Sequence, residues 1–387
     1  MRRNSTKIVA LLLTLCFFLT SCGQAASNGS SPNGTDTPGG STGGGGGGGA
    51  GPTILFVLTG SLGDSGVGDA TYAVLKNAAE KMNGNVVAFE CNYDASLYES
   101  SVIDACQSGE YDLIVAGYYN LQEAVMLGAE QYPNQKFLCF DVAFDYSDGK
   151  YPNIVSYQAR QNECGFLSGV VAGILTTSGV EGTNPDKTVG FVGAAENTAI
   201  QDFLVGYIEG VNFIDSQIEV LYAFVGDWAN TAKAKELGYA QIQQGADVSY
   251  SVCGNAGLGN AEAAAEAGHW NLNVDQDWAT ATAESNPELS KVILTSSVKA
   301  YTTIIESAME EYVAGTLQYG QHHLVGWADG AITMFENDTY KRIFTPEMKS
   351  AYDAVCDDLA AGKIHVGTAI GATQAEIEAY KAKAKPF

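Results

Sequence analysis

The sequence predicts an α/β protein of two doubly wound parallel-sheet lobes joined by a hinge. From residue 53 onward, short apolar runs alternate with stretches of helical periodicity, which is the order of a parallel sheet with crossover helices. The apolar runs are continuous, as is typical of strands that are buried on both faces. About 336 residues follow the Gly-rich segment near the N-terminus, which is more than one hydrophobic core usually serves.

The alternation predicts the elements of each lobe in order. For the first lobe it predicts strands at residues 53–58, 85–91, 112–118 and 136–143, and helices at residues 69–83, 98–109 and 121–133. After residues 153–157 it predicts helices at 163–175, 199–213, 231–245 and 259–268, and strands at 187–193, 218–226, 247–254 and 271–275. Further elements after residue 291 suggest that the chain crosses between lobes more than once. The expected lobes are 53–156 plus 279–320, and 157–278 plus 321–387.

The first 21 residues have the layout of a secretory signal peptide. Arg2, Arg3 and Lys7 precede about a dozen apolar residues, a run shorter than the roughly 20 that a membrane-spanning helix needs. The tripeptide LTS before Cys22 resembles the bacterial lipobox, in which the cysteine is acylated. We therefore expect Cys22 to anchor the protein on the extracytoplasmic face of the cell membrane. An ordinary signal peptide that ends near a cysteine is the alternative.

The segment from Cys22 to residue 52 is rich in Gly, Ser, Asn, Pro and Thr and can bury almost no apolar surface. We expect a flexible tether. A chain of this length and composition reaches on the order of 30 Å, from roughly 5–6 Å times the square root of its length. The folded body would then be held near the membrane and remain free to turn beside it.

The charge of the chain argues against several partners. The formal net charge is −24, and it becomes about −27 when the basic residues of the signal leave. Such an acidic body should be repelled by nucleic acid phosphates and by anionic lipid headgroups. We expect no nucleic acid partner, membrane contact through the anchor only, and a monomer.

The cysteines and histidines indicate no metal or cofactor. Most of the six cysteines beyond Cys22 lie inside apolar strand or helix patterns and form no Cys-x-x-Cys pair, which favours buried thiols, although an exported protein could hold one disulfide. The adjacent His322 and His323 have no neighbours at metal-ligand spacing, so a surface or packing role is favoured.

The loops that follow the strands are where a ligand should bind, because ligands of open α/β sheets lie at the carboxyl ends of the strands. The first of these loops holds glycines at positions 60, 63, 66 and 68, but their spacing is not that of a dinucleotide-binding loop. Asp64 and Asp69 would also face a pyrophosphate with like charge. Tight turns explain these glycines better.

Carboxylates and aromatic residues collect in the strand-end loops. These residues are Asp64, Asp69, Asp141, Asp227, Asp275, Asp277, Trp228, Trp278 and Tyr118. Paired acids could hydrolyse glycosides, but carboxylates serve equally as acceptors for the hydroxyl groups of a neutral ligand. No Gly-x-Ser-x-Gly motif occurs, and no nucleophile and base can be paired from the pattern. A site for binding a sugar-bearing or heterocyclic molecule is favoured over a catalytic one.

Several stretches in one order resemble the basic membrane protein family of bacterial lipoproteins, the nucleoside-binding components of ABC importers. The resemblance covers residues 54–334, and its stretches include NIVSYQARQNECGFLSGVVAGIL, TVGFVGAAENTAIQDFLVGYIEGV, NVDQDW and ILTSSVKAYTTII. It implies a type I periplasmic-binding-protein fold with two lobes and a three-stranded hinge that closes on a nucleoside.

The resemblance also implies roles for particular residues. Asp64 matches the acid that hydrogen-bonds the base, and Trp228 the aromatic residue that stacks on it. Asp275 and Lys299 match the residues that hold the ribose hydroxyls, and Gly254 matches a close backbone approach to the ligand. A solvated lysine at a helix start is the alternative for Lys299. The expected ligand-binding set is Asp64, Val67, Gly68, Asp69, Tyr118, Asp141, Trp228, Gly254, Asp275 and Lys299.

The first loop departs from the family pattern. Where the family reads like D-K-S-F-N-Q, this chain reads DSGVGD, so Val67 replaces the second stacking aromatic and Gly68 the amide that reads the base. One aromatic wall is missing unless Tyr72, Tyr118 or Tyr119 supplies it. The base preference is therefore not implied by the resemblance.

We expect a lipid-anchored, non-enzymatic substrate-binding protein that closes on a nucleoside, with a purine favoured, and delivers it to an ABC permease and its ATPase. One alternative is a receptor of the same fold that feeds a signalling system, which neighbouring genes would reveal. Another is a hydrolase that uses the acidic cleft, which a turnover assay would detect.

Overall fold

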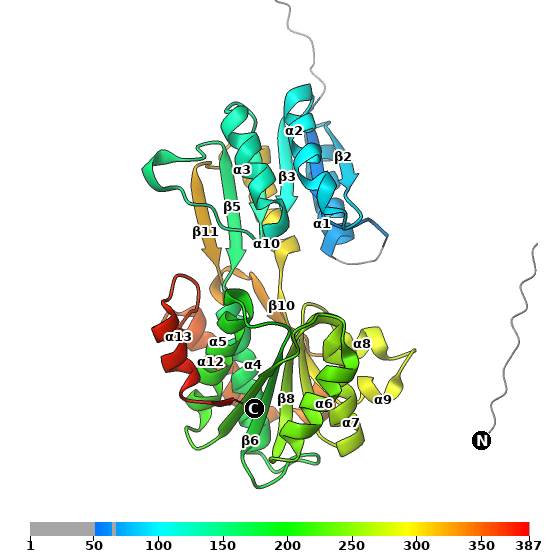
Figure 1. Ribbon diagram of the computed structural model, residues 1–387, viewed down its shortest axis with the longest axis vertical. Helices are drawn as coiled ribbons and strands as arrows, with labels where there is room; N and C mark the ends of the chain where they lie inside the picture. The colour runs from blue at the N-terminus through cyan, green and yellow to red at the C-terminus, as the bar shows by residue number, and fades with distance from the viewer. Residues whose placement is uncertain (1–50, 64–66, 387) are drawn as a thin grey trace, which may run out of the picture. The chain divides into compact units, whose positions relative to one another are not determined.

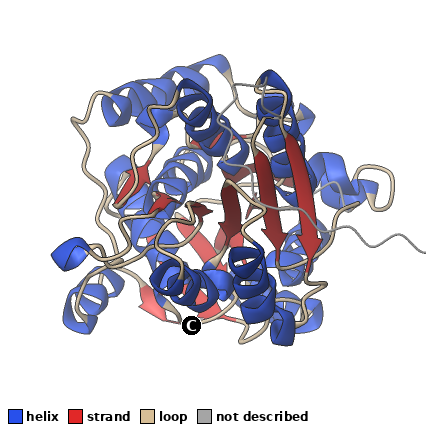
Figure 2. Ribbon diagram, turned by 90° about the horizontal axis from the view of Figure 1, so that it is seen from above, coloured by secondary structure: helices blue, strands red, loops and turns tan. Residues whose placement is uncertain are grey.

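Two sheets organise the chain in the computed structural model, which describes residues 51–63 and 67–386. Each sheet is covered by helices on both faces, so each forms the centre of one lobe (Figures 1 and 2). The predicted fold class, two doubly wound lobes with parallel sheets, is confirmed.

The first sheet is entirely parallel, with the strand order β11-β5-β4-β3-β1-β2. Its strands are β1 (Thr53–Leu58), β2 (Asn85–Glu90), β3 (Leu113–Gly117), β4 (Phe137–Phe140), β5 (Ile154–Ala159) and β11 (Gln321–Val325). All residues of β3 and β4 are buried, which accounts for their continuous apolar sequences.

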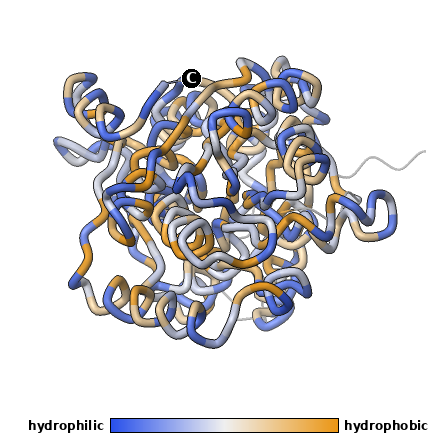
Figure 3. The backbone as a smooth tube through the Cα atoms, turned by 90° about the horizontal axis from the view of Figure 1, so that it is seen from below, coloured by the Kyte–Doolittle hydropathy of each residue, from blue (hydrophilic) through white to orange (hydrophobic). Residues whose placement is uncertain are grey.

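Two pairs of helices cover the first sheet. Helices α1 (Val67–Lys81) and α10 (Tyr301–Ala314) pack on one face around Leu75 and Ile305. Helices α2 (Tyr98–Ser108) and α3 (Gln122–Gln131) pack on the other. The apolar side chains of these helices therefore face the strands. Seen from below, hydrophilic and hydrophobic residues alternate along many of the outer turns of the folded body (Figure 3).

The second sheet has the order β12-β10-β9-β8-β6-β7-β13 and is parallel except for β12, which runs antiparallel to β10. Its strands are β6 (Thr188–Gly193), β7 (Glu219–Phe224), β8 (Ala246–Val252), β9 (Trp270–Val274), β10 (Ile293–Lys299), β12 (Ile332–Met334) and β13 (Lys385–Pro386).

The second sheet is also covered on both faces. Helices α4 (Gln161–Thr176), α5 (Thr198–Ile214) and α12 (Pro346–Ala360) contribute to one core layer. Helices α6 (Thr231–Ile242) and α7 (Gly257–Ala267) contribute to the smaller layers on the other side. The remaining short α-helices are α8 (Trp278–Thr282), α9 (Pro287–Ser290), α11 (Asp338–Ile343) and α13 (Gln374–Lys381).

The chain passes between the lobes at residues 160, 300 and 326. The backbone N–H of Arg160 donates to the carbonyl of Val325 at 2.8 Å, and that of Ala300 donates to Ala331 at 2.8 Å. The sequence had placed residues 279–320 in the first lobe, but β10 pairs with β9 in the second sheet, while β11 pairs with β5 in the first. The residues of these strands carry no sign of which sheet they join, because strand pairing is set by contacts between segments far apart in the sequence.

The expected signal peptide, Cys22 and all of the expected tether except residues 51 and 52 lie outside the described residues. Within residues 51–63 and 67–386, no helix combines the length and apolar character that crossing a membrane would require. The cysteines in this part of the chain, Cys91, Cys106, Cys139, Cys164, Cys253 and Cys356, are all buried and free, as expected.

Candidate functional site

A cavity of about 540 Å³ lies between the two lobes at the carboxyl ends of their strands. The first lobe lines it with Tyr119, Gln122, Asp141, Val142, Ala143 and Gln158. The second lobe and the crossing segments line it with Gln161, Asn197, Thr198, Ala199, Ile200, Phe203, Trp228, Val252, Val274, Asp275 and Lys299. This volume falls within the range of about 300–1,000 Å³ that small-molecule sites occupy.

An ion pair between the lobes forms one part of the cavity wall. Asp141 directly follows β4, and Lys299 is the last residue of β10. The Lys299 Nζ lies 3.2 Å from both carboxylate oxygens of Asp141, and the hydroxyl of Tyr301 donates to Asp141 Oδ1. Burial lowers the pKa of Lys299, but the charges of Asp141 and Asp275 outweigh this effect and raise it, so the ammonium stays charged at neutral pH.

Asp275 supplies a second carboxylate to the same cavity. It directly follows β9, and its backbone N–H donates to the carbonyl of Ser297 on the neighbouring β10 at 3.0 Å. Its side chain is open to the cleft, yet desolvation by the enclosing walls raises the pKa of Asp275. The positive charge of Lys299 lowers this pKa, and the negative charge of Asp141 raises it. Two carboxylates around one ammonium leave this region with a net negative charge.

Trp228 projects from the loop that follows β7. Asp227 holds this loop by accepting hydrogen bonds from the backbone N–H groups of Ala229 and Asn230, at 2.6 and 2.9 Å. Gly254, with φ +57°, lies beneath the indole, since a Cβ at this position would stand 3.4 Å from Trp228 Cε3. Gly254 therefore supports the ring and is not among the residues that line the cavity.

Three of the predicted residues lie elsewhere, around a smaller cavity of about 140 Å³. Val67, Gly68 and Tyr118 line this space inside the first lobe, together with Phe56 and Phe140. Asp69 does not line the cleft either, because its carboxylate accepts from the backbone N–H of Gly63 at 2.8 and 3.1 Å and so shapes the first loop. Asp64 lies outside the described residues.

The structure adds amide side chains that the sequence reasoning missed. Gln122, Gln158, Gln161 and Asn197 all line the cleft. Asn197 lies in a strand-end loop and caps α5 by accepting from the backbone N–H of Ile200 at 3.0 Å. The loop position was a usable signal for Asn197, whereas Gln158 lies near the end of β5 and Gln161 begins α4, on either side of a crossing whose place the sequence pattern does not reveal.

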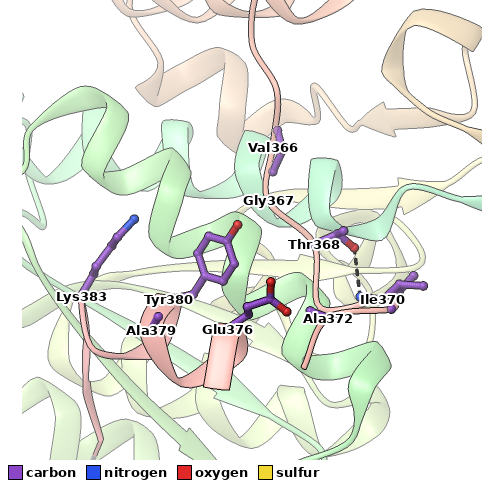
Figure 4. Close-up of a pocket in the computed structure, with 10 residues that line it drawn as sticks. Val366, Gly367, Thr368, Ile370, Ala372, Glu376, Ala379, Tyr380 and Lys383 are labelled. Atoms are coloured by element: carbon purple, nitrogen blue, oxygen red, sulfur yellow. Dashed lines mark hydrogen bonds between the residues drawn. The ribbon is translucent and has the colours of Figure 1, made fainter. Parts of the chain in front are cut away.

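A separate hollow of about 570 Å³ lies on the second lobe, between residues 366–372 and α13 (Figure 4). The segment beside it is fixed by Asp202, which accepts from Thr368 Oγ1 and the backbone N–H of Ala369 at 2.6 and 2.7 Å. Glu376, Tyr380 and Lys383 line this hollow, and none of the predicted ligand-binding residues does.

Carboxylates, amides and aromatic rings line the interlobe cavity. Among the described lining residues there is no histidine, serine or cysteine, and the charged groups are Asp141, Asp275 and Lys299. Asp227 and Asp277, two of the acids that the sequence placed near the site, cap or shape loops instead. The cavity is thus lined at one position by the exposed indole of Trp228 and at another by the carboxylate of Asp275, which can accept hydrogen bonds from hydroxyl groups.

Comparisons with known proteins agree with this geometry. Residues 52–352 match the family model described as ABC transporter substrate-binding protein PnrA-like. The chain is 27% identical over 252 residues to the CD4+ T-cell-stimulating antigen of Listeria monocytogenes, covering 62% of this chain and 66%, just under two thirds, of that protein. It is 22% identical over 305 residues to Basic membrane protein D of Borreliella burgdorferi, covering 77% and 84% of the two chains.

A solved structure of an ABC transporter solute-binding protein from Aeropyrum pernix K1 is similar in fold. It superposes with a TM-score of 0.65 over 86% of this chain and 98% of that chain, at 21% identity. Agreement at this identity concerns the fold of the two lobes.

Proposed function

Because the chain belongs to the family of PnrA-like ABC transporter substrate-binding proteins, we propose that it binds a nucleoside, preferably a purine nucleoside, between its lobes. It then delivers the nucleoside to a membrane permease that is driven by a cytoplasmic ATPase. We also propose that acylated Cys22 holds the body at the outer face of the membrane. No chemical conversion of the ligand is part of this proposal.

The observation that carries the proposal is the meeting of Trp228, Asp275 and Lys299 in one cavity. These side chains come from the ends of different elements, far apart in the sequence. The resemblance assigns the first to the base and the other two to the ribose. An indole face can stack on any base, and a carboxylate with a nearby ammonium accepts from and donates to hydroxyl groups.

The charge of the cleft also favours a nucleoside over a nucleotide. Asp141 and Asp275 together exceed the single positive charge of Lys299, and the whole chain is strongly acidic. A phosphate group entering this cavity would meet a negative field, so a neutral nucleoside should bind more tightly than its monophosphate.

Thermal unfolding of the purified protein tests the proposal. The panel consists of purine and pyrimidine nucleosides, their free bases, their monophosphates and simple sugars. A ligand at about 100 times its dissociation constant stabilises the folded state by roughly 2.7 kcal/mol, which raises the melting temperature measurably. We expect one nucleoside class to stabilise the protein and the sugars to have no effect. Stabilisation by a sugar without any nucleoside effect would overturn the proposal.

A further inference from the structure

The resemblance implies a second stacking aromatic residue in the first loop, and this chain has none there. Residues 59–69 contain no aromatic side chain. Val67 and Gly68, at the start of α1, line the smaller cavity inside the first lobe and not the interlobe cavity. Any second wall must therefore come from another element.

Tyr72 and Tyr118 are both engaged in the first lobe. Both pack at the edge of its core, and the ring of Tyr118 meets Phe140 edge to face at a centroid distance of 5.5 Å. The ring of Tyr72 lies under the ammonium of Lys76 at 5.7 Å. Neither of these tyrosines lines the interlobe cavity.

Tyr119 differs from both in lining the interlobe cavity. It follows β3 in the first lobe, while Trp228 follows β7 in the second, so the two side chains approach the cavity from opposite lobes. Tyr119 is 73% exposed and Trp228 is 50% exposed. Among the described residues, neither ring is paired with another aromatic ring, so both have surface available for a ligand.

The backbone around Tyr119 is fixed although the ring is exposed. Tyr118, which precedes it, has φ +70°, an uncommon conformation for a side-chain-bearing residue, and its N–H donates to the carbonyl of Phe140 at 2.8 Å. Leu121 is buried, and Gln122 Nε2 donates to the carbonyl of Ala143 at 2.5 Å. The loop thus presents Tyr119 from a rigid base, which reduces the entropy lost when a ligand binds.

We propose that Tyr119 is the second aromatic wall, so that the base of a bound nucleoside stacks between Tyr119 and Trp228. This inference rests on the proposed function and specifies how it is carried out in this chain. Because the walls belong to different lobes, a base can contact both fully only when the lobes have closed. Stacking on Tyr119 therefore favours the closed state.

Calorimetric titration with the nucleoside that most stabilises the protein tests the inference. We expect Tyr119→Ala to weaken binding by about 5- to 150-fold, the range that loss of one stacking partner produces. Tyr119→Phe keeps the π-face and should bind like the wild type. The matched control is Phe213→Ala, because Phe213 is 51% exposed on α5 and does not line the cleft.

The outcomes separate this inference from the proposed function. Failure of every nucleoside to bind the wild type would remove both. Normal nucleoside binding by Tyr119→Ala, with normal melting temperature, would overturn the role of Tyr119 and leave the proposed function standing. A Tyr119→Ala/Trp228→Ala double variant adds a second readout: if both rings hold the same base, its loss of affinity should differ from the sum of the single losses.

Discussion

Three residues at the cleft end of strands hold a backbone conformation that side chains rarely adopt. Tyr118, Asp141 and Asp275 directly follow β3, β4 and β9, and their φ angles are +70°, +55° and +73°. Such conformations cost roughly 1–3 kcal/mol each and collect at binding sites. Asp tolerates this region better than most residues, but its presence in a sequence does not predict it. The sequence could therefore predict that these residues follow strands, and not how their backbones orient them.

As the pH falls, we expect nucleoside binding to weaken at a higher pH than it would if Asp275 had the pKa of an ordinary aspartate. The pKa of Asp275 is raised by desolvation in the cleft, and the Asp141 charge adds to this, against the opposing effect of Lys299. The ionised carboxylate accepts stronger hydrogen bonds from hydroxyl groups than the protonated carboxyl group does. As the pH falls, Asp275 should thus become protonated, and affinity should fall, before the pH reaches the usual aspartate value near 3.9.

Calorimetry over a pH series with Asp275→Asn as the comparison checks this. The variant should bind more weakly at neutral pH, because each charge-assisted hydrogen bond contributes about 1.5–3 kcal/mol, and its affinity should not change over the same pH range. The ligand must keep its own charge throughout, and circular dichroism should show a folded protein. Equal affinity of variant and wild type at neutral pH would remove Asp275 from the site.

At the scale of elements, helices α4 and α5 pack unusually closely in the second lobe. Gly165 and Gly169 of α4 lie against the backbone of α5, and Gly206 and Gly210 of α5 lie against the backbone of α4. Almost every residue of α4 is buried. The contact matters for the interlobe cavity because Asn197 and Thr198, at the start of α5, line it, so this helix pair positions part of the cavity wall.

We expect Gly169→Ala to destabilise the protein, although alanine normally favours a helix by about 1 kcal/mol over glycine. A Cβ on Gly169 would collide with the carbonyl oxygen of Tyr207, and backbone cannot move aside without separating the helices. Overpacking of this kind costs about 1–3 kcal/mol or more. Chemical denaturation of both proteins measures the difference.

Gly173→Ala in the same helix is the matched control. Its Cβ would stand 3.0 Å from the Cβ of Ile214, a tight contact but a much longer one than that between a Gly169 Cβ and the carbonyl oxygen of Tyr207. We therefore expect a smaller loss of stability, or a gain. Equal effects of the two variants would contradict the argument from backbone contact.

The sequence predicts most of the regular elements but not these contacts. Apolar runs located β1 to β4 and β6 to β9, and most of these strands are buried on both faces, which leaves a continuous apolar signal. The short helices α8, α9, α11 and α13 were missed, since each offers too few turns for periodicity to show. The glycines of α4 and α5 were visible, but only the structure shows that they face each other.

At the scale of the whole folded body, the three crossings near residues 160, 300 and 326 leave the lobes joined by short segments with a cavity between them. The sequence predicted that the chain crosses between the lobes more than once. It did not predict which sheet β10 and β11 join, because that depends on pairing between segments far apart in the sequence. The same long-range pairing brings Asp141 of one lobe to Lys299 of the other sheet. Ligand binding and lobe closure should therefore be coupled.

We expect a bound nucleoside to lower the radius of gyration measured by small-angle X-ray scattering. Tyr119 and Asp141 belong to one lobe, whereas Trp228 and Asp275 belong to the other, so a ligand that contacts all of them binds the closed state more tightly than the open one. Trp228→Ala should require more ligand for the same change, because it weakens binding without altering the crossings. A sugar that fails to stabilise the protein serves as the control ligand. Saturation in calorimetry without any change in scattering would show that the lobes bind the ligand without closing, and the coupling of recognition to closure would then be wrong.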